Sequence, residues 1–139
     1  FHLAGTASMT PLCDITPESL HQEMVAKVQG AWNLHEALRD HELESFVLYG
    51  SIAGFWGAGG QLAYAAANAA LTGLVQHRRA QGQPATVIHW GRWAEGGLVD
   101  AQTAAYLSRR GILALDSASA LRSLGRALQQ DRPAPVIAN

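Results

Sequence analysis

Apolar residues recur along the chain in two patterns, which predict strands that alternate with helices. Short apolar runs predict strands at 1–5, 46–49, 86–89 and 135–138. Apolar or small residues at helical spacing predict helices over 17–39, 61–80, 103–109 and 117–130. Apolar strands between helices favour a parallel sheet that is covered on both faces. The predicted fold class is therefore α/β, with a doubly wound parallel sheet.

One charged residue interrupts the apolar stripe of the helix predicted over 17–39. This helix begins at the cap Thr16-Pro17, and Lys27 lies inside its stripe. A lysine on a buried face is costly unless it has a partner, so Lys27 is a candidate functional residue. In the alternative interpretation, its aliphatic stem packs while its ammonium reaches water.

The composition and charge of the chain argue against binding of nucleic acid, a membrane span and a metal site. The chain has 139 residues, 48% of them hydrophobic and 15% charged, with a net charge of -1. These values are typical of one globular domain over 1–139 and offer no footprint for nucleic acid. Its single cysteine, Cys13, fits a reducing compartment, and its apolar stretches are too short for a membrane span, so we expect a cytoplasmic protein. The six histidines lack metal-ligand spacing, and we expect no metal site.

Three residues near the predicted strand at 46–49 suggest carbonyl chemistry. Ser51 follows this strand, Tyr64 comes thirteen residues later, and Asn68 lies one helical turn further on. Reduction of a ketone needs a proton donor, and a phenol with an ordinary pKa of about 10 becomes a better one beside an ammonium such as that of Lys27. A serine hydroxyl can hold the carbonyl oxygen where charge develops. On the same helical face as Tyr64, Asn68 can hold a water or a backbone group.

The predicted strand ends also indicate where a cofactor would lie. Gly5, Ser51 and Gly91 each follow a predicted strand, and ligands of such sheets bind at the carboxyl ends of strands. No G-x-G-x-x-G turn follows the first strand, and Phe1 begins in mid-strand. We therefore expect this chain to be the C-terminal part of a longer domain whose N-terminal nucleotide-binding half is missing.

Six segments of the chain form a specific combination. They are His2-Leu-Ala-Gly5, Ala26-Lys-Val-Gln-Gly-Ala-Trp-Asn-Leu34, Ser51-Ile-Ala-Gly-Phe-Trp-Gly57, Gly60-Gln-Leu-Ala-Tyr-Ala-Ala-Ala-Asn-Ala69, His77-Arg-Arg79 and Trp90-Gly-Arg-Trp93. Together they resemble the ketoreductase domain of a modular (type I) polyketide synthase, within the short-chain dehydrogenase/reductase superfamily. The lysine on the preceding helix separates this pattern from ordinary short-chain dehydrogenases, whose lysine follows the tyrosine by four residues. Two positions depart from the family pattern: Arg92 replaces a common proline, and Gly50 replaces a frequent serine.

The resemblance implies a Rossmann-like fold and a set of residue roles. Tyr64 would donate the proton, Ser51 would position the carbonyl, Lys27 would bind the nicotinamide ribose, and Asn68 would support a proton relay. NADPH would supply the hydride. The expected cofactor-binding residues are Ala4, Gly5, Lys27, Tyr64, Trp90 and Gly91.

The resemblance also implies a substrate, a stereochemical outcome and partners. The substrate would be a β-ketoacyl thioester tethered to an acyl carrier protein through phosphopantetheine, and other synthase domains would be partners. Trp56 and Gln61 resemble the A-type pattern that gives an L-hydroxyl without epimerisation, and Ser8-Met9-Thr10 stands where B-type domains carry Leu-Asp-Asp.

Other interpretations of the same residues stay open. The chain could be a noncatalytic, degenerate reductase domain or a fragment that completes another chain's fold, and Tyr64 and Trp56 could be ordinary packed aromatics. Arg78-Arg79 and Arg109-Arg110 are expected as surface charges near helix ends, although either pair could meet an acidic carrier protein. Residues 94–110 are expected to form a lid.

Overall fold

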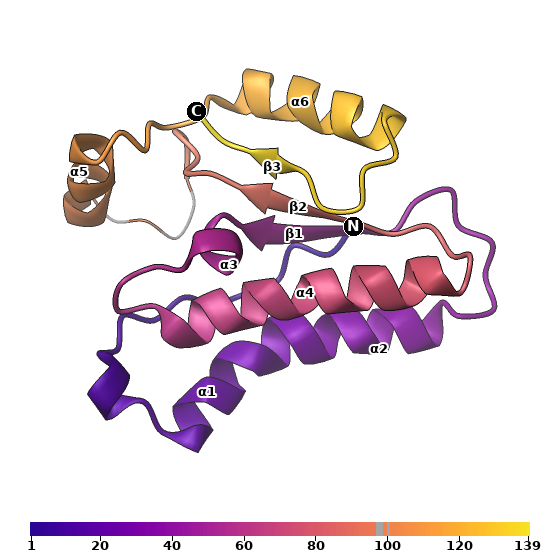
Figure 1. Cartoon of the computed structure of the whole chain (residues 1–139), viewed down its shortest axis with the longest axis horizontal. Coiled ribbons are helices and arrows are strands. Elements are labelled where there is room, and N and C mark those ends of the chain that lie inside the picture. The colour runs from indigo at the N-terminus through magenta and orange to yellow at the C-terminus, as the bar shows by residue number, and fades with distance from the viewer. Residues whose placement is uncertain (97–98, 100) are drawn as a thin grey trace.

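Three parallel strands form the sheet at the centre of the structure (Figure 1). The structure is a computed structural model that describes residues 1–96, 99 and 101–139. The strands are β1 (Val47–Ser51), β2 (Thr86–Trp90) and β3 (Val136–Ile137), in the order β1-β2-β3. The parallel α/β fold predicted from the sequence is confirmed.

The prediction of a strand over residues 1–5 is largely wrong. Only His2 pairs in this segment, opposite Leu48, with His2 N–H donating to the Val47 carbonyl at 2.9 Å. After His2 the segment leaves β1, and Gly5 comes to lie against the side chain of Lys27.

Side chains that alternate along the strands build two separate cores. Leu48 and Val87 belong to a cluster with residues of α2 and α4, whereas Val47 and Ile88 belong to a cluster with residues of α6. In Figure 1, α2 and α4 accordingly lie on one face of the sheet and α6 on the other. The expectation of helices on both faces is confirmed.

The helices follow the sequence prediction closely, with different ends. Their bounds are η1 Leu12–Asp14, α1 Pro17–Met24, η2 Val25–Gln29, α2 Gly30–Ala37, α3 Ala53–Trp56, α4 Leu62–Ala80, α5 Ala101–Arg109 and α6 Ser117–Gln129. Thr16 caps α1 through reciprocal hydrogen bonds with Ser19, and Gly82, at φ 72°, follows α4 in the left-handed conformation. The short helix α3 lies where the sequence predicted only a glycine-rich loop.

The helix predicted over 17–39 is interrupted by a π-helical turn, η2, which the sequence prediction missed. Lys27 lies in this turn, and its carbonyl accepts a hydrogen bond from His2 Nε2 at 3.0 Å. A π-helical turn places one extra residue within a helix and changes the direction of the side chains around it. Here it brings Lys27 to the end of β1.

A buried polar pair joins α2 to α4. Arg78 is only 1% exposed, donates to His35 Nδ1 at 2.9 Å, and stacks over the Phe46 ring at 4.1 Å. The expectation that Arg78 is a surface charge is therefore wrong, because His35 and Phe46 enclose its guanidinium. Its neighbour Arg79 does lie near the surface, where it pairs with Asp131 at 2.8 Å. The pair of Arg78 and His35 holds the helix that leads from Lys27 against the helix that carries Tyr64.

We predict that His35 makes the free energy of unfolding fall as the pH is lowered. Burial, followed by the nearby charge of Arg78, lowers the pKa of His35 from 6.5. Its contribution to stability is therefore fully present above pH 6.5 and is lost as the pH falls below that value toward the folded-state pKa. His35→Asn keeps an acceptor near Arg78 but cannot titrate, so urea unfolding on both sides of pH 6.5 should show a weaker pH dependence.

The same substitution at an exposed histidine just after α2, His41→Asn, is the matched control. An equal pH dependence in His35→Asn and the unmutated protein would contradict this account.

Candidate functional site

A cavity of 1010 Å³ lies at the carboxyl ends of β1 and β2. Eight of the ten site residues expected from the sequence line this cavity: Gly5, Lys27, Ser51, Trp56, Gln61, Tyr64, Trp90 and Gly91. Neither Ala4, which is exposed, nor Asn68, which is fully buried, lines the cavity. The sequence thus selected residues from five separate segments that the fold brings together.

Lys27 is buried, at 6% exposure, and is held by the backbone of β1. Its Nζ donates to the Tyr49 carbonyl at 3.0 Å, and within residues 1–96, 99 and 101–139 no carboxylate forms an ion pair with it. Burial lowers the pKa of Lys27 from its usual 10.5, because water solvates the charged form better. The ammonium thus has a specific partner, which disfavours the alternative that it simply reaches water.

Gly5 makes room for this ammonium. A Cβ atom at Gly5 would lie 2.7 Å from Lys27 Cε and 3.0 Å from Lys27 Nζ, closer than carbon and nitrogen atoms can pack. The N-terminal segment can therefore pass over the lysine without displacing its ammonium from the Tyr49 carbonyl only because residue 5 has no side chain.

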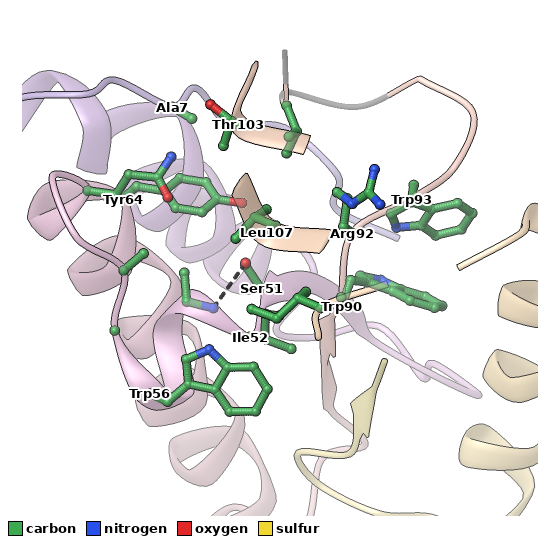
Figure 2. A pocket seen from close by; sticks show the side chains of 18 of the residues that line it. Ala7, Ser51, Ile52, Trp56, Tyr64, Trp90, Arg92, Trp93, Thr103 and Leu107 are labelled. Carbon is green, nitrogen blue, oxygen red and sulfur yellow. Dashed lines mark hydrogen bonds between the residues drawn. The ribbon is translucent and has the colours of Figure 1, made fainter. Parts of the chain in front are cut away.

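Ser51 ends β1 with its hydroxyl at the cavity. Its Oγ accepts a hydrogen bond from the Ala53 N–H at 3.2 Å, drawn as the dashed line in Figure 2. Because the backbone donor occupies a lone pair of the oxygen, the hydroxyl hydrogen can still be donated to a ligand. The next residue, Ile52, is tied to β2 through its N–H, which donates to the Trp90 carbonyl at 2.9 Å.

Tyr64 reaches the same cavity from the first turns of α4. Figure 2 shows its ring extending into the cavity, on the side where the Ser51 hydroxyl lies. One turn later, Asn68 Nδ2 donates to the Tyr64 carbonyl at 2.8 Å, while its Oδ1 has no protein partner in the described structure. Of the two roles expected for Asn68, the structure shows contact with a backbone group.

Helix α3 packs closely on Asn68. A Cβ atom at Gly54 would lie 2.8 Å from Asn68 Cβ and 2.8 Å from the Ala69 nitrogen. Gly54 therefore permits α3, which ends at Trp56, to lie directly against α4. Trp56 itself is 57% exposed and lines the cavity, so it is not an interior packing residue.

Residues of α5 and the loop after β2 complete the cavity, and the sequence did not single out most of them. Figure 2 shows Thr103 and Leu107 of α5 together with Arg92, Trp93 and Trp90. Arg92 Nη2 donates to Ser108 Oγ at 3.1 Å and so joins this loop to α5. A tryptophan pair, Trp90 and Trp93, has ring centroids 4.9 Å apart. The sequence signals for this wall were the motif Trp90-Gly-Arg-Trp93 and the lid expected over 94–110.

The segment expected as a lid, 94–110, contains α5 and lies beside the cavity. Gly96, Val99, Thr103, Tyr106 and Leu107 line the cavity from this segment. Residues 97, 98 and 100, which the expectation also includes, lie outside the described residues. Movement of the segment stays a prediction.

The described residues contain neither a membrane-spanning helix nor a metal-binding cluster. In the part of the chain that the structure describes, no helix is long and apolar enough to cross a membrane. Within the same residues, no three His, Cys, Asp or Glu side chains gather as a possible metal site.

Known synthases and solved ketoreductases are similar to this chain. It is 42% identical over 137 residues to mycoketide-CoA synthase of Mycobacterium tuberculosis, covering 95% of this chain and 3% of that protein. It is 42% identical over 138 residues to the pikromycin polyketide synthase component PikAIII of Streptomyces venezuelae, covering 99% of this chain and 9% of that protein. The chain thus spans a small part of these relatives.

Solved structures of ketoreductases share the fold of this chain. A structure of A-type ketoreductases from a modular polyketide synthase matches with a TM-score of 0.95 and 42% identity, over 99% of this chain and 29% of that one. A structure of an A1-type ketoreductase matches with a TM-score of 0.95 and 41% identity, over 99% of this chain and 29% of that one.

The model of the KR domain family matches residues 1–95, the part of the chain that includes Lys27, Ser51, Tyr64 and β2. With this match, the relatives and the shared fold, the chain belongs to the ketoreductase (KR) domain family of modular polyketide synthases.

Proposed function

We propose that this chain is the catalytic part of a domain that reduces a β-ketoacyl thioester to a β-hydroxyacyl thioester with NADPH. The observation that carries this proposal is the meeting of Lys27, Ser51 and Tyr64 in one cavity at the carboxyl ends of β1 and β2. A noncatalytic scaffold would not need an ammonium, a hydroxyl and a phenol at one site. The nucleotide-binding half of the domain would be supplied by chain outside these residues.

The residues of the cavity fit a nicotinamide cofactor. The Lys27 ammonium has three hydrogens and uses one on the Tyr49 carbonyl, which leaves donors for the hydroxyls of a ribose. Gly5, Trp90 and Gly91 would line the nicotinamide side, and the volume of 1010 Å³ leaves space for a substrate as well. When bound, NADPH would supply the hydride.

The chain's own groups would handle the substrate oxygen. Ser51 donates its free hydroxyl hydrogen to the carbonyl oxygen and holds it where negative charge develops. Tyr64 then gives its phenolic proton to that oxygen, and Lys27 offsets the charge that results. Asn68 holds the Tyr64 carbonyl, and its unpaired Oδ1 can accept a hydrogen bond from a water that returns the proton.

The product would carry an L-configured hydroxyl, without epimerisation of the neighbouring carbon. Trp56 and Gln61, the two residues of the expected A-type pattern, both line the cavity. Solved ketoreductases described as A-type and A1-type share the fold at 42% and 41% identity. Chiral chromatography of the product tests the assignment, which a D-hydroxyl would contradict.

A substrate tethered to an acyl carrier protein fits the charge of the cavity. Arg92, Arg109 and Arg110 line it together with Lys27, and no aspartate or glutamate is found among its described lining residues. Positive charge without a competing carboxylate favours an anionic group such as the phosphate of phosphopantetheine. Other synthase domains would be further partners.

The domain would act in the reducing cytoplasm. Its one cysteine, Cys13, is an exposed free thiol, which is typical of proteins in that compartment.

Tyr64→Phe should reduce turnover by about 10²-fold or more, because it removes the proton donor but keeps the ring. The measurement is NADPH oxidation with a β-keto thioester in the full-length protein, together with fluorescence titration of NADPH, whose affinity should change little. Tyr106→Phe, at another tyrosine of the cavity, is the matched control and should stay active. Retention of most activity in Tyr64→Phe would rule out this tyrosine as the acid and favour a noncatalytic role.

Gly5→Ala should lower turnover by about 10- to 100-fold, because the new methyl group would displace the Lys27 ammonium from the Tyr49 carbonyl. NADPH oxidation with a β-keto thioester in the full-length protein measures this loss of turnover. Gly59→Ala adds the same methyl group at the cavity, where it would meet no atom within 4 Å, and should have little effect. Equal losses in the two variants would show that the packing on Lys27 is not the cause.

Replacing both Arg109 and Arg110 with Gln should raise the KM for a carrier-bound substrate, whereas the KM for a short thioester without phosphate should change little. Steady-state kinetics with both substrates measure this difference. Arg126→Gln, at an exposed arginine of α6 away from the cavity, is the control. Parallel changes with both substrates would argue against recognition of the phosphate.

A further inference from the structure

A buried histidine contacts the backbone of Ser51 from the neighbouring strand. His89 is 2% exposed, and its Nδ1 lies 3.1 Å from the Ser51 carbonyl oxygen. Its Cα is paired with that of Gly50 across β1 and β2, so the ring starts beside the residue that precedes Ser51. His89 does not line the cavity and would not touch the substrate.

The partners of His89 determine the tautomer of its ring. A carbonyl oxygen can only accept, so Nδ1 must carry the hydrogen that it donates to Ser51. In the neutral ring Nε2 is then the acceptor, and the Thr72 hydroxyl, 3.2 Å away on α4, donates to it. Burial lowers the pKa of His89, partly opposed by the bond to Ser51, which favours this neutral ring.

Gly50 provides the space that His89 needs. A Cβ atom at Gly50 would lie 3.3 Å from His89 Nδ1 and 2.9 Å from Val87 Cγ2. A larger residue at position 50 would therefore press against the imidazole. The departure from serine at this position has a structural explanation in this chain, because Val87 and the ring of His89 occupy that volume.

We propose that His89, oriented by Thr72, is a positioning residue that fixes the peptide of Ser51 and thereby aims its hydroxyl into the cavity. This proposal rests on the proposed function of Ser51. Three hydrogen bonds then hold the turn at the end of β1: His89 to the Ser51 carbonyl, Ala53 N–H to Ser51 Oγ, and Ile52 N–H to the Trp90 carbonyl. Without His89 the carbonyl of Ser51 loses its side-chain donor, and the hydroxyl loses part of its orientation.

The kinetic test uses variants in the full-length protein. His89→Leu should lower kcat by about 10- to 100-fold with little change in KM, because a misaligned hydroxyl stabilises the transition state less well. His89→Asn, which can place an amide donor near the position of Nδ1, should recover most of kcat. Thr72→Val should lower kcat by a smaller factor than His89→Leu, and Thr72→Ser, which keeps the hydroxyl, should not.

The double variant separates positioning from general stability. In a Ser51→Ala background, His89→Leu should cause no further loss of kcat, because the hydroxyl that it aims is gone. The same fold-loss in both backgrounds would overturn the proposal, as would full activity of His89→Leu or failure of His89→Asn to recover kcat in a protein that folds.

Nitrogen NMR of the His89 ring gives a readout that does not depend on activity. The expected signature is a neutral ring with hydrogen on Nδ1, which changes in Thr72→Val. Hydrogen on Nε2 would overturn the proposal even if every leucine variant misfolded. The Nδ1–H signature together with full activity of Tyr64→Phe and Ser51→Ala would instead refute the proposed function and leave the contact between His89 and Ser51 standing.

Discussion

The ammonium of Lys27 is buried against the end of β1, and its hydrogen bond to the Tyr49 carbonyl is the contact on which the site is built. A buried cation without a carboxylate is costly, so the surrounding structure must hold it in place. Three features do so: the absence of a side chain at Gly5, the π-helical turn η2, and the contact of His2 with the Lys27 carbonyl. The N-terminal segment, the helix and the strand are thus joined at a single residue.

The sheet brings the remaining groups to this residue. Parallel strands end at the same edge, so Ser51 after β1 and Trp90 at the end of β2 face one cavity, which Tyr64 enters from the helix between these strands. Because α4 and α6 cover opposite faces of strands that follow one another in order, the two crossovers must have opposite hands. One of them is therefore left-handed, which is rare for parallel strands.

Sequence patterns predicted the three strands of the sheet, the main helices and most of the residues that meet at the cavity, because apolar periodicity and strand ends are local signals. The apolar run at 1–5 was wrongly predicted to be a strand, since only His2 pairs with β1. They missed the π-helical turn, since the stripe of apolar residues continues across it. Arg78 was misjudged because an arginine near a helix end looks like a surface charge, and only the fold shows that His35 accepts its hydrogen bond. The contact of His89 with Ser51 was also missed. The orientation of the His89 ring depends on Gly50 and Thr72, which lie far from it in sequence.

The π-helical turn η2 has a consequence for how this helix can change during evolution. It contains one residue more than a regular helix would accommodate, so deletion of a single residue there would relax the segment into an uninterrupted α-helix. A π-helical turn uses one more residue than an α-helical turn for nearly the same rotation, so the helices on either side would keep their faces and only the side chains within the turn would change direction. The loss of a single codon could thus turn the Lys27 ammonium away from the Tyr49 carbonyl while α1 and α2 keep their packing, so the position of this cation depends on a one-residue insertion in the helix.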